Sequence, residues 1–150
     1  MSKFLTLVAF LIVVPALGAF IGLSFPADEW YQVLNKPFFT PRPQLFGVVW
    51  PILYIMVAVA GWRVFVSEGQ TPGWGLWVGQ MVLNFAWSPT FFGAHQIFWA
   101  MLIIAAALAL SVTFVSVTWT RDKFASLLFV PYSAWLAFAL ALNFTIWLMN

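Results

Sequence analysis

The sequence predicts an all-α membrane protein, a bundle of five transmembrane helices in which residues 1–150 form a single domain. Three observations lead to this prediction. Of the 150 residues, 64% are hydrophobic and only 7% are charged, whereas about a quarter of the residues of a soluble domain are charged. The charged residues leave four long uncharged runs, which are residues 4–27, 43–62, 69–120 and 124–150. These runs lack the alternation of apolar and polar residues that is typical of transmembrane β-strands.

A helix needs about 20 residues to cross the hydrocarbon core of a membrane. The first, second and fourth runs therefore fit one helix each. The third run fits two, separated by the small and polar break Gly93-Ala94-His95-Gln96. The predicted spans are residues 4–25, 44–65, 73–92, 97–119 and 124–148.

The first span has an alternative interpretation. Lys3, the apolar residues that follow it and the small residues near Pro15 also resemble a signal peptide with a cleavage site. We favour a retained helix because apolar character continues through Leu23 to Phe25.

Lys and Arg residues in short loops favour the cytoplasmic side. Four basic residues are expected at the N-terminal end of the bundle and two at the other end, namely Lys3, Arg63, Arg121 and Lys123 against Lys36 and Arg42. This bias predicts a cytoplasmic N-terminus and an external C-terminus. A helical bundle also favours the bacterial inner (cell) membrane over the outer one, where spanning proteins are usually barrels.

The segment 26–42 is the one long connection. Asp28 and Glu29 suit the start of a short helix, and Lys36-Pro37 suits its end. The segment is too aromatic for a free linker. It fits either an interfacial belt of aromatic residues or a lid folded across the mouth of the bundle.

Polar residues within the predicted spans mark the faces that point inward, because an unpaired polar group in hydrocarbon is costly. Three such stripes combine aromatic rings with a few polar groups. They are Phe46, Trp50 and Tyr54 in the second span; Gln80, Asn84, Trp87 and Ser88 in the third; and Tyr132, Trp135, Ala139 and Asn143 in the fifth. The stripes suit a cavity for a flat, largely apolar ligand. They equally suit ordinary hydrogen bonding between helices.

Prolines and glycines add weaker signals. Pro15, Pro51, Pro89 and Pro131 lie in or at the ends of spans, where they can bend a helix and widen the bundle. Gly18/Gly22 and Gly75/Gly79 are small-xxx-small pairs that allow close helix packing. They fit either tight packing within one protomer or a dimer interface, and of the two pairs Gly75/Gly79 is the better candidate for the interface.

Several chemistries have no support in the sequence. There is no Cys, and His95 is the single His, so thiolate sites are excluded and neither a metal site nor a Ser/His/Asp triad has its partners. No charged residue lies within a predicted span except Arg63 near an end, which disfavours ion pumps and charge-coupled carriers. We therefore predict no metal and no obligatory cofactor.

Four motifs together carry a resemblance to a known family. They are Trp30-Tyr31-x-x-Leu34-x-Lys36-Pro37-x-x-x-Pro41; Trp50-x-x-Leu53-Tyr54; Gln80-x-x-Leu83-Asn84-x-x-Trp87-x-Pro89-x-Phe91-Phe92-Gly93; and Pro131-Tyr132-x-x-Trp135-x-x-x-Ala139-x-x-Leu142-Asn143. In this order and spacing the chain resembles the TspO/MBR family of tryptophan-rich sensory proteins and translocator proteins, from about residue 15 to residue 145.

The resemblance implies a homodimer of five-helix chains with a cavity capped by the first loop. It implies as ligands porphyrins such as protoporphyrin IX and haem, isoquinoline and benzodiazepine drugs and, in animal members, cholesterol. The ligand-binding residues implied by the motifs are Tyr31, Trp50, Tyr54, Asn84, Trp87, Trp135 and Ala139. In some bacterial relatives, tryptophans that match Trp50 and Trp135 are implicated in light-dependent porphyrin breakdown.

The chain departs from the family at two places. The loop reads Phe38-Phe39-Thr40-Pro41-Arg42-Pro43, where relatives often have Trp and a Pro-Pro pair, and Arg42 is suited to a porphyrin propionate or to an interfacial anchor. The C-terminal segment 144–150 lacks the Lys or Arg of the animal cholesterol motif. The expected function is thus a membrane receptor or sensor that binds porphyrins and regulates or detoxifies them. The alternatives are a light-dependent porphyrin-degrading enzyme and a transporter of porphyrins or other small apolar molecules.

Overall fold

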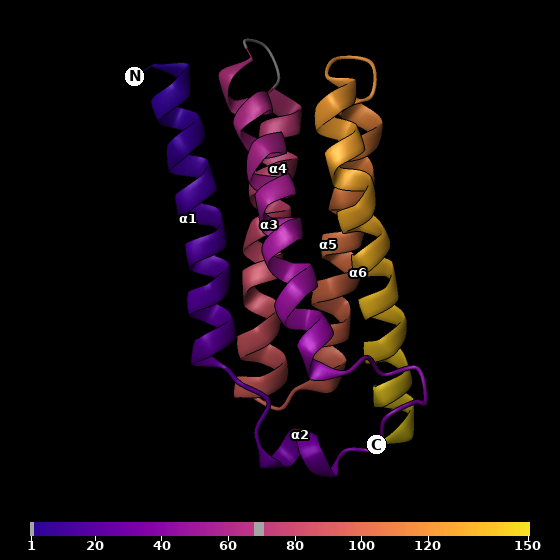
Figure 1. Cartoon of the computed structure of the whole chain (residues 1–150). Helices are drawn as coiled ribbons and strands as arrows, with labels where there is room; N and C mark the ends of the chain where they lie inside the picture. The colour runs from indigo at the N-terminus through magenta and orange to yellow at the C-terminus, as the bar shows by residue number, and fades with distance from the viewer. Residues whose placement is uncertain (1, 68–70) are drawn as a thin grey trace.

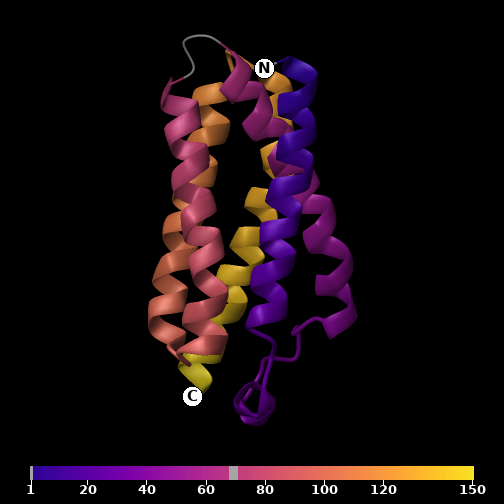
Figure 2. The same cartoon turned by 90° about the vertical axis from the view of Figure 1, so that its left-hand side faces the viewer.

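The computed structural model describes residues 2–67 and 71–150. Within these ranges the chain is entirely helical, with no strand, which confirms the predicted all-α class. Long helices stand side by side, and the N- and C-termini lie at opposite ends (Figures 1 and 2). In chain order the elements are α1 (Lys3–Ser24), α2 (Glu29–Val33), α3 (Pro43–Val66), α4 (Thr71–Ser88), the π-helical turn η1 (Pro89–Gly93), α5 (Ile97–Thr118) and α6 (Lys123–Met149).

Four of the described helices, α1, α3, α5 and α6, are long and apolar enough to cross a membrane. This confirms a multi-pass membrane protein. α4 is not among the four, because its 18 residues include polar Gln80 and Asn84 and several glycines that lower its mean hydropathy. The prediction of five spans therefore depends on how α4 is interpreted.

Local chemistry sets where the helices begin. The Ser2 hydroxyl accepts a hydrogen bond from the Leu5 N–H at 3.3 Å. Asp28 accepts one from the Tyr31 N–H at 3.2 Å, which confirms the predicted short helix in the loop. Asp122 accepts one from the Ala125 N–H at 3.0 Å. Such side-chain caps satisfy N–H groups that have no partner within their own helix.

The predicted break before α5 is also confirmed. The chain is α-helical to Ser88 and then makes one wider π-helical turn from Pro89 to Gly93 before α5 begins at Ile97. Pro89 has no N–H to donate to the ladder. π-turns of this kind are rare and are often found at functional sites.

Small residues allow close packing of α3 against its neighbours. A Cβ atom on Gly61 would overlap the indole ring of Trp77, and one on Gly18 of α1 would overlap the ring of Tyr54. The Trp77 indole N–H donates to the Val57 carbonyl at 2.9 Å in the buried core. These contacts hold α1 and α4 against α3.

An ion pair joins two helices at the end of the bundle where the N-terminus lies. The Arg63 guanidinium is 2.7 Å from the Asp122 carboxylate, and the Asp122 side chain is only 7% exposed. The pair joins α3 to the start of α6. Arg63 thus has a structural partner at the end of its helix.

Candidate ligand-binding site

A chain of four polar side chains crosses the interior between α3, α4 and α6. The Tyr54 hydroxyl donates to the Asn84 amide oxygen at 2.9 Å. The Asn84 amide nitrogen donates to the Tyr132 hydroxyl at 3.0 Å, and that hydroxyl donates to the Gln80 amide oxygen at 2.7 Å. Gln80 and Tyr132 are fully buried. The chain therefore joins three helices through groups that would be costly to bury alone.

Aromatic rings lie next to the Tyr54 end of this chain of hydrogen bonds. The Trp50 indole stacks on the Tyr54 ring, with centroids 5.3 Å apart. Trp135 meets Trp50 edge to face at 6.4 Å and Phe46 at 5.7 Å. The structure thus brings Trp50, Tyr54, Asn84 and Trp135, predicted from the sequence, into one continuous set of contacts, which we name the inner site.

Two buried hydrogen-bond donors beside these contacts lack a partner among the described residues. They are the indole N–H of Trp135 and the amide NH₂ of Gln80. An unpaired buried donor is destabilising until it meets an acceptor. The inner site therefore combines flat aromatic surface with donors suited to an oxygen acceptor.

Trp87 and Tyr31 belong to a second group, near the π-turn. The Trp87 indole stacks on Phe91 at 5.0 Å and donates to the Asn143 amide oxygen at 3.0 Å. The Tyr31 ring meets Phe91 at 6.1 Å and Phe92 at 5.3 Å. Trp87 also packs against the main core, so it connects this group to the inner site. Its N–H is already used by Asn143.

Ala139 lies one turn after Trp135 on α6. It is partly buried and packs against the main core. Its side chain is a single methyl group, so it occupies little space on the face of α6 that also carries Trp135.

The segment 26–42, which we name the lid, packs across the end of the bundle near the C-terminus (Figures 1 and 2). Its inward side chains contact a small core made by Phe91, Ala100, Leu142 and Ile146; they are Trp30, Tyr31, Leu34 and Phe39. Burial raises the pKa of the Tyr31 hydroxyl above its usual value. These four side chains therefore pack against the end of the bundle.

Polar contacts fix the C-terminal half of the lid. Lys36 donates to the Tyr31, Gln32 and Leu34 carbonyls at 2.6, 3.1 and 2.9 Å. Asn35 and Asn150 join the lid to the end of α6: the Asn150 amide oxygen accepts from the Asn35 N–H, and the Asn150 amide nitrogen donates to the Asn35 carbonyl, each at 3.0 Å.

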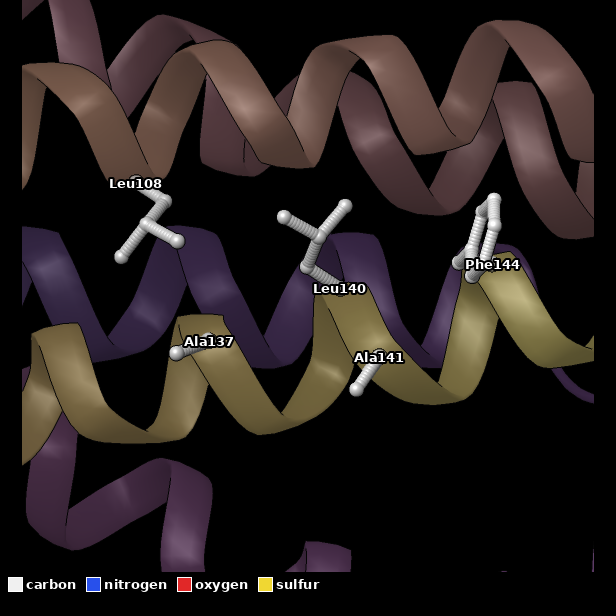
Figure 3. Close-up of a pocket in the computed structure, with 5 residues that line it drawn as sticks. All are labelled: Leu108, Ala137, Leu140, Ala141 and Phe144. Atoms are coloured by element: carbon white, nitrogen blue, oxygen red, sulfur yellow. The ribbon is translucent and has the colours of Figure 1, made fainter.

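The pocket in Figure 3 lies elsewhere. It is an open hollow of about 360 Å³ between α5 and α6, lined by Leu108, Ala137, Leu140, Ala141 and Phe144. Its lining is apolar and open to the outside of the bundle, where lipid chains would lie. None of the predicted ligand-binding residues lines it, and we do not place the ligand there.

The two glycines of the pair on α4 lie in different surroundings. A Cβ on Gly79 would lie 3.1 Å from Leu110 of α5, so Gly79 packs within the chain, whereas Gly75 faces open space. Gly75 thus has room for contact with another helix, whereas Gly79 packs against α5.

Gly18 offers a test of the inner site from α1. We expect Gly18→Ala to push the Tyr54 ring and thereby weaken its contacts with Trp50 and Asn84, because the new methyl group would overlap that ring. Overpacking of this kind typically costs about 1–3 kcal/mol. The measurement is the free energy of unfolding in detergent together with porphyrin affinity. Equal values for Gly18→Ala and the unaltered protein would contradict the packing described.

Gln80 and Tyr132 lie on the predicted inward stripes but are not among the ligand-binding residues that the motifs imply. The signal was available, because Gln80 lies one helical turn before Asn84. The pairing of Asp28 with His95 gave no sequence signal, since the two are 67 positions apart. Among the described residues, no group of three or more His, Cys, Asp or Glu side chains could hold a metal ion.

Comparison with known proteins gives a consistent result. The model of the "TspO/MBR family" matches residues 7–148. "Protein CrtK" of Rhodobacter capsulatus is 37% identical, over 97% of this chain and 94% of the relative. The human "Translocator protein" is 38% identical over 91% and 85%. "Tryptophan-rich protein TspO" of Archaeoglobus fulgidus is 38% identical over 97% of both chains.

Proposed function

Because the chain belongs to the TspO/MBR family, we propose that it is a membrane receptor that binds porphyrins in the inner site beneath the lid and regulates or detoxifies them. Protoporphyrin IX and related tetrapyrroles are the ligands that the site suits best. They are flat and apolar across the ring and carry carboxylates at one edge, which matches a site of aromatic faces with few polar groups.

The observation that carries this proposal is the junction of Trp50, Tyr54 and Trp135. Trp50 and Trp135 meet edge to face at 6.4 Å, and the buried Trp135 N–H has no partner among the described residues. Aromatic side chains favour stacked or edge-to-face contact with other rings. An indole pair with a free donor is therefore suited to a macrocycle that presents both a π-face and oxygen acceptors.

The positive charge of Arg42 supports one orientation of the bound ligand. Arg42 is exposed at the start of α3, one helical turn before Phe46, whose ring contacts Trp135. Guanidinium groups pair well with carboxylates. In this proposal the macrocycle enters the inner site, and its propionates face Arg42 and the lid.

The proposal also covers how the chain lies in the membrane and how its copies associate. α4 would be a fifth span, since its polar Asn84 and Gln80 face other helices rather than lipid. The membrane would be the bacterial inner membrane, and two copies would associate as a homodimer.

Titration with protoporphyrin IX tests the function. We expect saturable quenching of tryptophan fluorescence by protoporphyrin IX in detergent, and about tenfold weaker binding for Asn84→Leu, because that change removes the central partner of the polar chain. The matched control is Thr113→Leu on α5, whose exposed hydroxyl bonds only within its own helix. Quenching that rises without saturation, or equal affinity in Asn84→Leu, would contradict the proposal.

The same two indoles favour a second candidate function, the light-dependent breakdown of bound porphyrin. A photoexcited macrocycle held against Trp50 or Trp135 can take one electron from the indole. Breakdown of the macrocycle would then need dissolved oxygen as oxidant, and a second turnover would need a reductant that restores the indole. Repeated product formation per protein under illumination would support an enzyme. Consumption of tryptophan without repeated product would leave the protein a receptor.

A further inference from the structure

The N-terminal half of the lid is held by a different contact from the C-terminal half. The His95 imidazole Nε2 lies 3.0 Å from the Asp28 carboxylate, and their side chains are 40% and 43% exposed. His95 belongs to the turn between η1 and α5, whereas Asp28 caps α2. The contact therefore joins the lid to the bundle.

Trp30 adds a second contact to the same imidazole. Its indole stacks on the His95 ring with centroids 4.2 Å apart and an interplanar angle of 13°. A cation above an indole face is attracted by the ring quadrupole. Protonation of His95 thus strengthens both of its contacts, the ion pair and the stack.

The backbone at His95 is unusual. It is the one non-glycine residue of the described chain with a positive φ, 55°. Residues other than Gly adopt this left-handed conformation uncommonly, and Asn, Asp and His are the most frequent among them; such outliers often mark functional positions. Here it lies in the turn that presents the imidazole to Asp28 and Trp30.

We propose that His95, Asp28 and Trp30 form a pH-dependent latch, which holds the lid against the bundle at acidic pH and loosens as the pH rises. The proposal concerns the lid alone and does not depend on which ligand the protein binds.

The charges of His95 and Asp28 determine in which direction the latch responds to pH. Imidazoles change charge between about pH 5 and pH 8, and a protonated imidazole beside a carboxylate is a cation that faces an anion. Partial desolvation raises the pKa of the Asp28 carboxyl, but hydrogen bonds from the Tyr31 N–H and from His95 outweigh it, and the pKa lies below the usual 3.8. Asp28 therefore stays charged across this range, and the change in attraction comes from His95.

The other ionisable groups of the lid are placed differently. Lys36 is engaged by backbone carbonyls, Tyr31 faces Phe91 and Phe92, and Glu29 is exposed on α2. The amides of Asn35 and Asn150 at the other fastening do not titrate. Loss of the latch would thus release α2 together with Asp28, while the contact of Asn35 with Asn150 does not change with pH.

Because the chain has no Cys, one introduced Cys can report on the lid. Val33 is 79% exposed at the end of α2, so a spin label on Val33→Cys should leave the packing unchanged. Between about pH 5 and pH 8 we expect the ratio of mobile to immobile spectral components to rise about two- to fivefold, as the loss of one exposed ion pair allows. A label on Val112→Cys, exposed on α5, is the control for general effects of pH.

Two variants separate the latch from other causes. In His95→Gln, which can still donate a hydrogen bond but never carries charge, the label at position 33 should show no pH dependence. Asp28→Asn should remove the dependence as well. A mobility that is constant in the unaltered protein, or a pH dependence that persists in His95→Gln, would overturn the proposal. Porphyrin titration is a separate measurement, so failure of the latch and failure of porphyrin binding can be told apart.

Discussion

Removing the indoles of Trp50 and Trp135 together is expected to weaken protoporphyrin IX binding by at least about 30-fold, since each aromatic contact is worth about 1 kcal/mol beyond the area that it buries. The two rings meet at 6.4 Å, and Trp50 also stacks on Tyr54. The double variant Trp50→Ala/Trp135→Ala therefore loses flat contact surface and the free Trp135 N–H together. Affinity measured from porphyrin absorbance avoids reliance on tryptophan emission.

The matched control removes two indoles that do not face the inner site. Trp99 on α5 and Trp119 at its C-terminal cap are exposed, and Trp99→Ala/Trp119→Ala should bind porphyrin as the unaltered protein does. Near-equal losses in both double variants would contradict the inner site, because binding would then depend on tryptophan content rather than on position.

The second large effect concerns stability. Gly61→Ala is expected to lower the free energy of unfolding by about 2–3 kcal/mol, because the added methyl group would overlap the Trp77 ring. That ring cannot move freely, since it is buried and its N–H is bonded to the Val57 carbonyl. Unfolding in mixed detergent, followed by helical circular dichroism, measures the change.

Gly22→Ala makes the same chemical change on α1, where nothing lies near the added carbon. There the substitution should be neutral or stabilising by up to about 1 kcal/mol, because alanine favours a helix more than glycine does. If Gly61→Ala were as stable as Gly22→Ala, the close packing of α3 and α4 would be wrong.

Much of the fold could be predicted because the membrane limits where charge can lie. The uncharged runs placed the long helices, and the turn at residues 93–96 followed from its small and polar residues. For α4, mean hydropathy does not confirm the predicted span. Its polar residues face other helices, and mean hydropathy cannot distinguish a span with an inward polar face from a helix that does not cross.

The site was predictable where periodicity and family motif agree. Tyr54 and Asn84 came from their stripes, and the structure joins them by a hydrogen bond. A stripe cannot show which partner a side chain selects, however. Trp87 bonds to Asn143, and Tyr132 lies within the polar chain between Asn84 and Gln80. These pairings depend on how three helices rotate against each other.

The contacts that hold the lid could not be predicted from the sequence. Its aromatic residues and its short helix were evident in the sequence, but its two fastenings connect positions far apart in the chain. Asp28 meets His95, and Asn35 meets Asn150. The first joins two exposed polar side chains and the second joins the Asn150 side chain to the Asn35 backbone. Long-range contacts of this kind leave no periodic pattern in the sequence. Only the arrangement of the bundle brings them together.

The most direct measurement maps which tryptophans react when the bound porphyrin absorbs light. The protein holds 10 tryptophans, and oxidation confined to the ligand contacts can be located by peptide mass analysis after brief illumination at one porphyrin per protein. We predict oxidation at Trp50 and Trp135, with Trp99 and Trp119 spared. Oxidation that spares Trp50 and Trp135 and falls on the exposed indoles would contradict binding in the inner site.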